Sequence, residues 1–245
     1  MQEQCNPYSI INEDSLNPLI LTCEHASSII PKEYNNLGLD EKYLDTHIAR
    51  DKGCKELTIT LSKRLNCTAF LANYSRLFID YNRRATEESL ILDESDEISI
   101  PGNKNISLKE REYRISKYHK PYYDAIYAKI NQLKSKSIEP KILSIHGYTP
   151  KLQKGDYRPW HAGILYVKEN PLTDKMLNGL KLKKDILVDA NVPYDMRLYN
   201  TGSSTICGED LGLENATIEI KDTEFENITQ GVNKWCEYIS EIILK

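Results

Sequence analysis

The chain has 245 residues, of which 40% are hydrophobic, and a formal net charge of −4. This length and composition suit one α/β domain with a sizeable core, and no Pro/Gly/Ser-rich run suggests a linker, so we expect a single domain over residues 1–245. The acidic balance without a basic stripe argues against a nucleic-acid partner, and no apolar run reaches the roughly 20 residues of a membrane span.

Neither the first residues nor the cysteines suggest secretion. Met1 to Gln4 lack the positive charge and the apolar segment of a signal peptide. In a chain of this length, scattered cysteines without a C-x-x-C pair are typical of reduced, mainly buried thiols. The six are Cys5, Cys23, Cys54, Cys67, Cys207 and Cys236. We therefore expect a cytoplasmic protein.

The first apolar run, Leu19 to Cys23, predicts a buried strand. Glu24 and His25 follow it directly, before a turn of small residues. In an open α/β sheet, ligands bind beyond the carboxyl ends of the strands. A carboxylate and an imidazole at such a place are ligands that zinc accepts. The alternative is a solvated corner at the end of a strand.

The next segments predict a helix and a strand. Residues 40–65 carry apolar side chains spaced for one face of a helix. His47 and Asp51 lie four positions apart and would share another face of it, where they could support a metal or simply lie at the surface. Residues 67–74 predict a strand, and a short apolar run after it ends at Asp80.

A long helix is predicted after an irregular segment. Residues 87–105 have no clear period and predict an exposed excursion. Ser107 and Glu110 have the spacing of a capping box, which begins a helix that extends to about residue 133. Pro121 lies inside this helix and should bend or split it, because proline cannot donate a backbone hydrogen bond.

The second half of the chain continues the alternation. Strands are predicted at 141–146, 162–167 and 216–220, an apolar run at 186–188, helices at 173–182 and 223–244, and an irregular segment at 191–212. His146 ends the first of these strands, and Glu219 lies within the last. This alternation predicts an α/β fold with a mixed, largely parallel sheet and helices on both faces.

Polar groups at the ends of apolar runs suggest a hydrolytic site. Two histidines and a carboxylate make a zinc site with one position open for water, and zinc lowers the pKa of that water to about 7. A carboxylate inside an apolar strand, such as Glu219, is costly without a partner or a function. Glu219 could act as a general base, or it could pair with an arginine.

Arginines near Asp80 suggest that the substrate is an anion. The planar guanidinium of Arg83 matches a carboxylate and could also stabilise a developing oxyanion, with the Asn82 amide beside it. Arg76 and Arg158 are further candidates for anion binding, although a surface salt bridge would also explain each of them. His119 lies in mid-helix among aromatic residues, and we expect a structural role for it.

Six short motifs, taken in order, resemble those of the N-formylglutamate amidohydrolase family. They are Cys23-Glu24-His25-Ala26, His47-Ile48-Ala49-x-Asp51, Ser75-Arg76-Leu77-x-x-Asp80-x-Asn82-Arg83, Arg158-Pro159-Trp160-His161, Asn191-x-Pro193-Tyr194 and Ile218-Glu219-Ile220. This family is related to the zinc carboxypeptidases and the aspartoacylases. The resemblance therefore implies a phosphorylase/hydrolase-like α/β fold and the hydrolysis of N-formyl-L-glutamate to formate and L-glutamate.

The resemblance also implies roles for individual residues. His25, Glu24 and His146 would bind the metal, expected to be zinc, and Glu219 would be the base. The candidate substrate-binding residues are Asn82, Arg83, Arg76, Arg158 and Tyr194, of which Arg83 would also take part in catalysis. Because adjacent side chains on a strand point to opposite faces, Asp51 and Asp80 remain alternatives to Glu24 as the carboxylate ligand.

Three functional hypotheses follow from the sequence. The leading one is a zinc-dependent amidohydrolase that acts on a small anionic N-acyl amino acid. The second is a deacylase with a different acyl group, or a peptidase-like hydrolase. The third is a non-catalytic protein of the same fold that binds an anionic ligand through Arg83. The family pattern has Arg where this chain has Lys221, and relatives often have a histidine within 201–212, so the exact acyl amino acid stays open.

Overall fold

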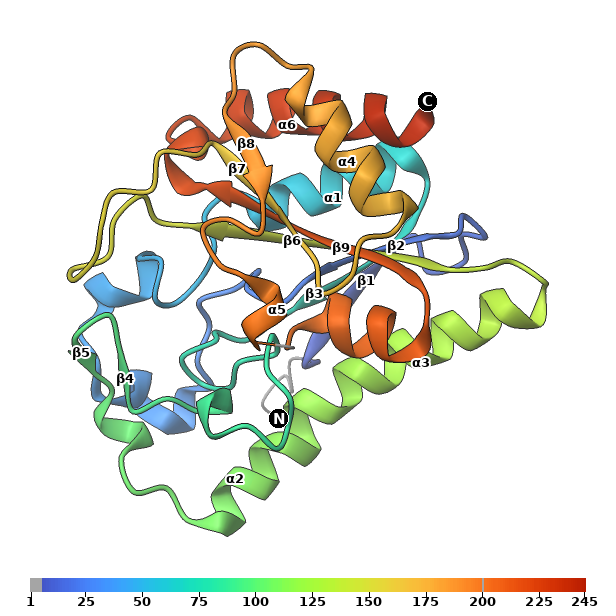
Figure 1. Ribbon diagram of the computed structural model, residues 1–245. Helices are drawn as coiled ribbons and strands as arrows, with labels where there is room; N and C mark the ends of the chain where they lie inside the picture. Colours follow the sequence, from blue (N-terminus) through green and yellow to red (C-terminus); the bar gives the residue numbers. More distant parts are fainter. Residues whose placement is uncertain (1–5, 200) are drawn as a thin grey trace.

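A seven-stranded sheet forms the centre of the protein (Figure 1). The computed structural model describes residues 6–199 and 201–245. In spatial order the strands are β1 (Tyr8–Ile11), β3 (Thr68–Ala72), β2 (Leu19–Cys23), β6 (Lys141–Tyr148), β9 (Glu214–Lys221), β7 (Ala162–Leu165) and β8 (Val188–Ala190). The central strands β3, β2, β6 and β9 run parallel, whereas β1 is antiparallel to β3 and β7 is antiparallel to β9. The predicted mixed, largely parallel sheet is confirmed.

Helices cover both faces of the sheet, as predicted (Figure 1). On one face lie α1 (Cys54–Leu65), α4 (Pro171–Lys181) and α6 (Ile228–Leu244). On the other lies α3 (Lys120–Ser135), while α2 (Leu108–Arg114), which extends away from the sheet, the short α5 (Met196–Tyr199) and the hairpin of β4 (Glu94–Ser95) and β5 (Ile98–Ser99) lie outside the layers. None of the described helices has the length and apolar character needed to cross a bilayer.

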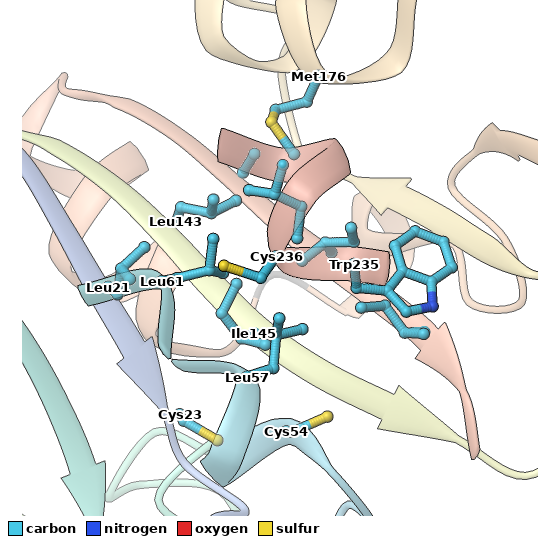
Figure 2. Close-up of a cluster of buried hydrophobic side chains, with 14 of the residues drawn as sticks. Leu21, Cys23, Cys54, Leu57, Leu61, Leu143, Ile145, Met176, Trp235 and Cys236 are labelled. Carbon is cyan, nitrogen blue, oxygen red and sulfur yellow. The ribbon is translucent and has the colours of Figure 1, made fainter. Parts of the chain in front are cut away.

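Two hydrophobic clusters explain why β2 is mainly apolar. Leu21 belongs to the cluster under α1, α4 and α6, and its neighbour Ile20 belongs to the cluster on the opposite face. Side chains that alternate along a strand between two covered faces are mainly apolar, and the buried exception, Thr22, hydrogen-bonds to other buried hydroxyls. Figure 2 shows the first cluster, in which Trp235 of α6 and Leu57 of α1 gather around Ile145 of β6.

The helix predicted over residues 40–65 is wrong in its first half. Residues Glu41–Asp45 form a short 3-10 turn, and the α-helix begins only at Cys54. Gly53 precedes it with a φ of 77°, a left-handed conformation that glycine adopts without strain. A Cβ at Gly53 would also lie 2.3 Å from Cγ of Phe225. His47 and Asp51 therefore do not share a helix face, and Asp51 lies in a loop.

The long helix before β6 changes its winding instead of breaking. Ser107 caps it by accepting a hydrogen bond from the backbone N–H of Glu110. Residues Ile115–His119 form a π-helical segment that joins α2 to α3, and Pro121 lies in the first turn of α3. A π-helical segment uses i→i+5 hydrogen bonds, and the Lys120 N–H accordingly donates to the carbonyl of Ile115.

Other elements agree with their predicted positions to within a few residues, but two differences remain. Residues 77–79, an apolar run, form turns, so Asp80 does not follow a strand. The edge strand β1 was not predicted, because its four residues show no distinctive pattern. The free, buried cysteines are Cys23, Cys54, Cys67, Cys207 and Cys236; Cys5 lies outside the described residues.

Candidate active site

The carboxyl ends of β2, β6 and β9 bring two histidines and a glutamate to one rim of the sheet. His25 follows β2 by two positions and His146 lies in β6. Glu219 of β9 is the direct register partner of His146. All three side chains are buried, with exposed fractions of 2%, 1% and 7% for His25, His146 and Glu219.

Asp51 completes a compact triangle of ligand atoms. The Nδ1 atoms of His25 and His146 lie 3.1 Å apart, and Asp51 Oδ2 lies 3.2 Å from the first and 3.1 Å from the second. Backbone hydrogen bonds fix the position of Asp51: its N–H donates to the His25 carbonyl, and the Gly147 N–H donates to its Oδ2. The loop before α1 thus brings a carboxylate between two strands.

The outer nitrogen of each histidine contacts a second carboxylate. His146 Nε2 lies 2.8 Å from Glu24 Oε2, and His25 Nε2 lies 2.8 Å from Asp80 Oδ1. A carboxylate can only accept, so each Nε2 carries a proton, and each Nδ1 faces Asp51 Oδ2, where a metal ion could replace a proton. This is the arrangement in which a histidine binds a metal while its other nitrogen is held by a carboxylate.

Glu24 lies behind His146 and outside the triangle. Its carboxylate also accepts hydrogen bonds from Tyr122 Oη at 2.6 Å and from Ser144 Oγ at 2.8 Å. Burial opposes the ionisation of Glu24, but hydrogen bonds from His146 and Tyr122 outweigh it and lower the pKa of Glu24 to about 2. Glu24 is therefore a buried, fully hydrogen-bonded anion. No local pattern indicates Tyr122 or Ser144 as its partners.

The charge balance of this cluster fits a divalent cation. Burial opposes ionisation at Asp51 and Asp80, but the neighbouring cationic groups prevail and hold the pKa of both well below the usual range. With neutral imidazoles, which a metal requires of its ligands, the negative charges of Glu24, Asp51 and Asp80 exceed the positive charges of Arg76 and Arg83 that act on them. Buried charges are costly unless they are paired or bind a metal. The donor set, two imidazoles and a carboxylate, is one that zinc prefers.

A cavity of about 270 Å³ opens beside the triangle. Its polar lining comes from His25, Arg76, Asn82, Arg83, Thr201 and Glu219, and its larger side chains from Leu165, Tyr194, Met196 and Tyr199, with Gly147 between them. Glu219 Oε2 has no hydrogen-bond partner among the described residues. Burial, assisted by the charge of Asp51, raises the pKa of Glu219 to about 8. The cavity therefore contains an unengaged carboxyl group close to the histidines.

The arginines predicted to bind anions differ in their surroundings. Arg76 lies 3.4 Å from Asp80 Oδ2 and 3.9 Å from Asp51 Oδ1. Arg83 donates to the carbonyl of Asn82 at 2.9 Å and has no ion pair within the described residues. Arg158 donates to the Tyr194 hydroxyl at 3.0 Å, and its guanidinium lies 4.9 Å over the Tyr194 ring, outside the cavity lining.

The helix over residues 108–135 holds the loop that carries Arg83. His119 Nε2 lies 2.8 Å from the Arg83 carbonyl, and Tyr123 Oη donates to the Tyr81 carbonyl at 2.6 Å. Arg114 donates to the Phe78 carbonyl at 2.9 Å. His119 belongs to the π-helical segment, so the change in winding sets the position of its ring. The spacing of the polar tips of His119 and Tyr123, four apart on one helix face, is a signal that could have revealed this contact.

Comparison with known proteins places this arrangement in a family. A family model for N-formylglutamate amidohydrolases matches residues 17–225. The chain belongs to the N-formylglutamate amidohydrolase family. This match confirms the resemblance of the six motifs, and family membership makes the protein a hydrolase of C–N bonds.

Solved structures of similar proteins support the fold of this amidohydrolase family member. A gene product from Agrobacterium tumefaciens is 27% identical with a TM-score of 0.90, and the match covers 99% of this chain and 97% of that chain. An N-formylglutamate amidohydrolase from Ralstonia eutropha is 18% identical with a TM-score of 0.70, and the match covers 96% of this chain and 95% of that chain. Among curated proteins, none matches this chain significantly.

Proposed function

We propose that this protein is a metal-dependent amidohydrolase that cleaves a small anionic N-acyl amino acid. The observation that supports it best is the triangle of His25 Nδ1, Asp51 Oδ2 and His146 Nδ1 beside a cavity with an unengaged glutamate. Membership of the family makes N-formyl-L-glutamate, which would yield formate and L-glutamate, the first substrate to test. Five buried free thiols support a cytoplasmic location.

The three atoms of the triangle are our proposed metal ligands. Of the carboxylates that the sequence left open, Asp51 is favoured over Glu24 and Asp80 because its Oδ2 contacts both Nδ1 atoms. Glu24 and Asp80 would orient the histidines through their Nε2–H groups. A divalent cation, in our view zinc, would polarise the acyl oxygen and acidify a coordinated water when bound.

Glu219 is our proposed general base. Its Oε2 would accept a proton from the attacking water and pass it to the amide nitrogen as the C–N bond breaks. A carboxyl group with a raised pKa near neutrality is suited to both transfers, because it can hold and release the proton at working pH. Arg83 would stabilise the oxyanion that develops on the acyl oxygen, in addition to binding the substrate carboxylate.

The remaining proposed substrate contacts follow from the lining of the cavity. Asn82 and Arg83 would bind the carboxylate of the substrate, because both line the cavity and Arg83 has no ion pair there. Arg76, which lies between the carboxylates of Asp51 and Asp80, would add to the binding of the substrate anion. The Tyr194 side chain would form one wall of the cavity, and Arg158, which stacks over the Tyr194 ring, would hold that ring in place.

The test combines metal content with product release. Purified protein should contain about one divalent metal per chain and release formate from N-formyl-L-glutamate, and a chelator should stop the release. Glu219→Gln should keep the metal and lose most of the turnover, about 100-fold or more, whereas the exposed Glu139→Gln should change neither. Normal turnover of Glu219→Gln would exclude it as the base. Negligible metal content together with tight binding of a dicarboxylate would favour the non-catalytic hypothesis.

A further inference from the structure

We infer that the preferred substrate of this site has a single carboxylate and an apolar side chain, so that N-formyl derivatives of amino acids such as leucine or methionine are cleaved in preference to N-formyl-L-glutamate. This inference rests on the proposed function and narrows its substrate class. It comes from the charges and the apolar surface that line the cavity.

The first argument concerns the cations that could receive carboxylates. Among the described residues that line the cavity, the arginines are Arg76 and Arg83. The guanidinium of Arg76 already lies between two buried carboxylates, at 3.4 Å from Asp80 Oδ2 and 3.9 Å from Asp51 Oδ1. Arg83 donates to the Asn82 carbonyl and forms no direct ion pair among the described residues, although its charge also acts on Asp80. The cavity thus offers one cation without a direct ion pair, enough for an α-carboxylate alone.

The second argument concerns the wall away from the polar residues. Leu165 and Met196 contribute alkyl and thioether surface, and the rings of Tyr194 and Tyr199 contribute aromatic surface. Arg158 donates to the Tyr194 hydroxyl and to the carbonyl of Thr149 and does not line the cavity, although its charge acts on Glu219. A second carboxylate placed against this wall would lose its hydration without gaining a direct ion pair. An apolar side chain would gain from burial there.

The third argument concerns size. At about 270 Å³ the cavity lies below the usual range of ligand pockets, roughly 300–1,000 Å³. A single acyl amino acid suits this volume better than a peptide. Met196 in this wall can adapt to the shape of a flexible apolar side chain.

The experiment compares kcat/KM of the zinc-loaded protein for the N-formyl derivatives of leucine, methionine, glutamine and glutamate. Glutamine serves as the neutral isostere of glutamate. We expect leucine and methionine to exceed glutamate by about tenfold or more, with glutamine between them. Tyr199→Lys adds a cation to the apolar wall at an exposed position and should raise the glutamate-to-leucine ratio, whereas Tyr199→Phe should not.

The outcomes separate this inference from the proposed function. A wild-type preference for N-formyl-L-glutamate would overturn the inference and leave the amidohydrolase proposal intact. If that preference disappeared in Arg158→Met, Arg158 would be the receptor of the second carboxylate. Failure of zinc-loaded protein to hydrolyse any of the four derivatives would overturn both the proposed function and the inference.

Discussion

The Nδ1 atoms of His25 and His146 lie 3.1 Å apart, although 121 positions separate the two residues in the chain. Each ring donates its outer N–H to a buried carboxylate, Glu24 or Asp80, so both inner atoms present lone pairs. Two lone pairs repel each other unless a proton or a metal ion lies between them. The protein therefore holds two histidines in an arrangement that favours binding of a cation.

Glu24 and Asp51 are expected to differ in their effect on metal affinity. Glu24→Gln should weaken zinc binding by about 10- to 100-fold, because a group that orients a ligand contributes that much. Asp51→Asn removes a charged ligand and should abolish stoichiometric binding. Competition with a chromogenic chelator measures both affinities. A complete loss of zinc in Glu24→Gln with retention in Asp51→Asn would show that Glu24 is the ligand instead.

Zinc affinity is expected to increase with pH across the neutral range. Burial disfavours the imidazolium of His146, but hydrogen bonds to Asp51 and Glu24 outweigh this and raise the pKa of His146 to about 10. Below that pH the metal-free protein holds a proton that zinc must displace, so the apparent affinity should rise up to about tenfold per pH unit. Chelator competition at several pH values tests this. An affinity independent of pH would contradict a His146 ligand.

His119 is expected to position Arg83 through the backbone. In His119→Phe the Arg83 carbonyl loses its hydrogen-bond partner, so the loop should shift and weaken the binding of the substrate carboxylate. We expect KM to rise about fivefold, as about 1 kcal/mol of a lost hydrogen bond implies, with a smaller change in kcat. His119→Gln places an amide N–H near the same point and should restore part of the affinity. Equal losses in kcat for both variants, with KM unchanged, would refute this role.

Gly163 is expected to be essential for stability. A Cβ at this position of β7 would lie 1.7 Å from the Val192 carbonyl oxygen, and both are backbone groups that cannot easily move. Gly163→Ala should reduce the free energy of unfolding by about 3 kcal/mol or more, or prevent folding. Urea denaturation measures the change. Gly212→Asn is the matched control, since nothing lies within 4 Å of its Cβ position and asparagine tolerates its left-handed conformation; equal stability of the two variants would contradict the prediction.

Local patterns predicted the sheet and the rim of the site better than the grouping of the proposed metal ligands. Apolar runs that end in His25 and His146 indicated adjacent strand ends, because parallel strands share an edge. The carboxylate could not be chosen from sequence, since Asp51 reaches the triangle only through the loop that Gly53 makes possible. Helical spacing instead suggested that this loop was part of α1.

The residues that hold Glu24 and the Arg83 loop in place were harder to predict. Tyr122 reaches Glu24, which lies 98 positions away, and no local pattern encodes such a contact. His119 looked structural because it lies among aromatic residues. Its orientation toward Arg83 depends on the π-helical segment, and a helix of regular period would place the ring differently. A pattern of period 3.6 cannot predict that change.

The position of β9 in the sheet has a consequence for biosynthesis. This late strand lies between β6 and β7, both of which leave the ribosome before it. Until it inserts, β6 and β7 have open edges, and the nascent chain carries His25, Asp51 and His146 without Glu219. If Glu219 is the base, as we propose, metal binding could precede catalytic competence, and activity would require nearly all of the polypeptide to be synthesised.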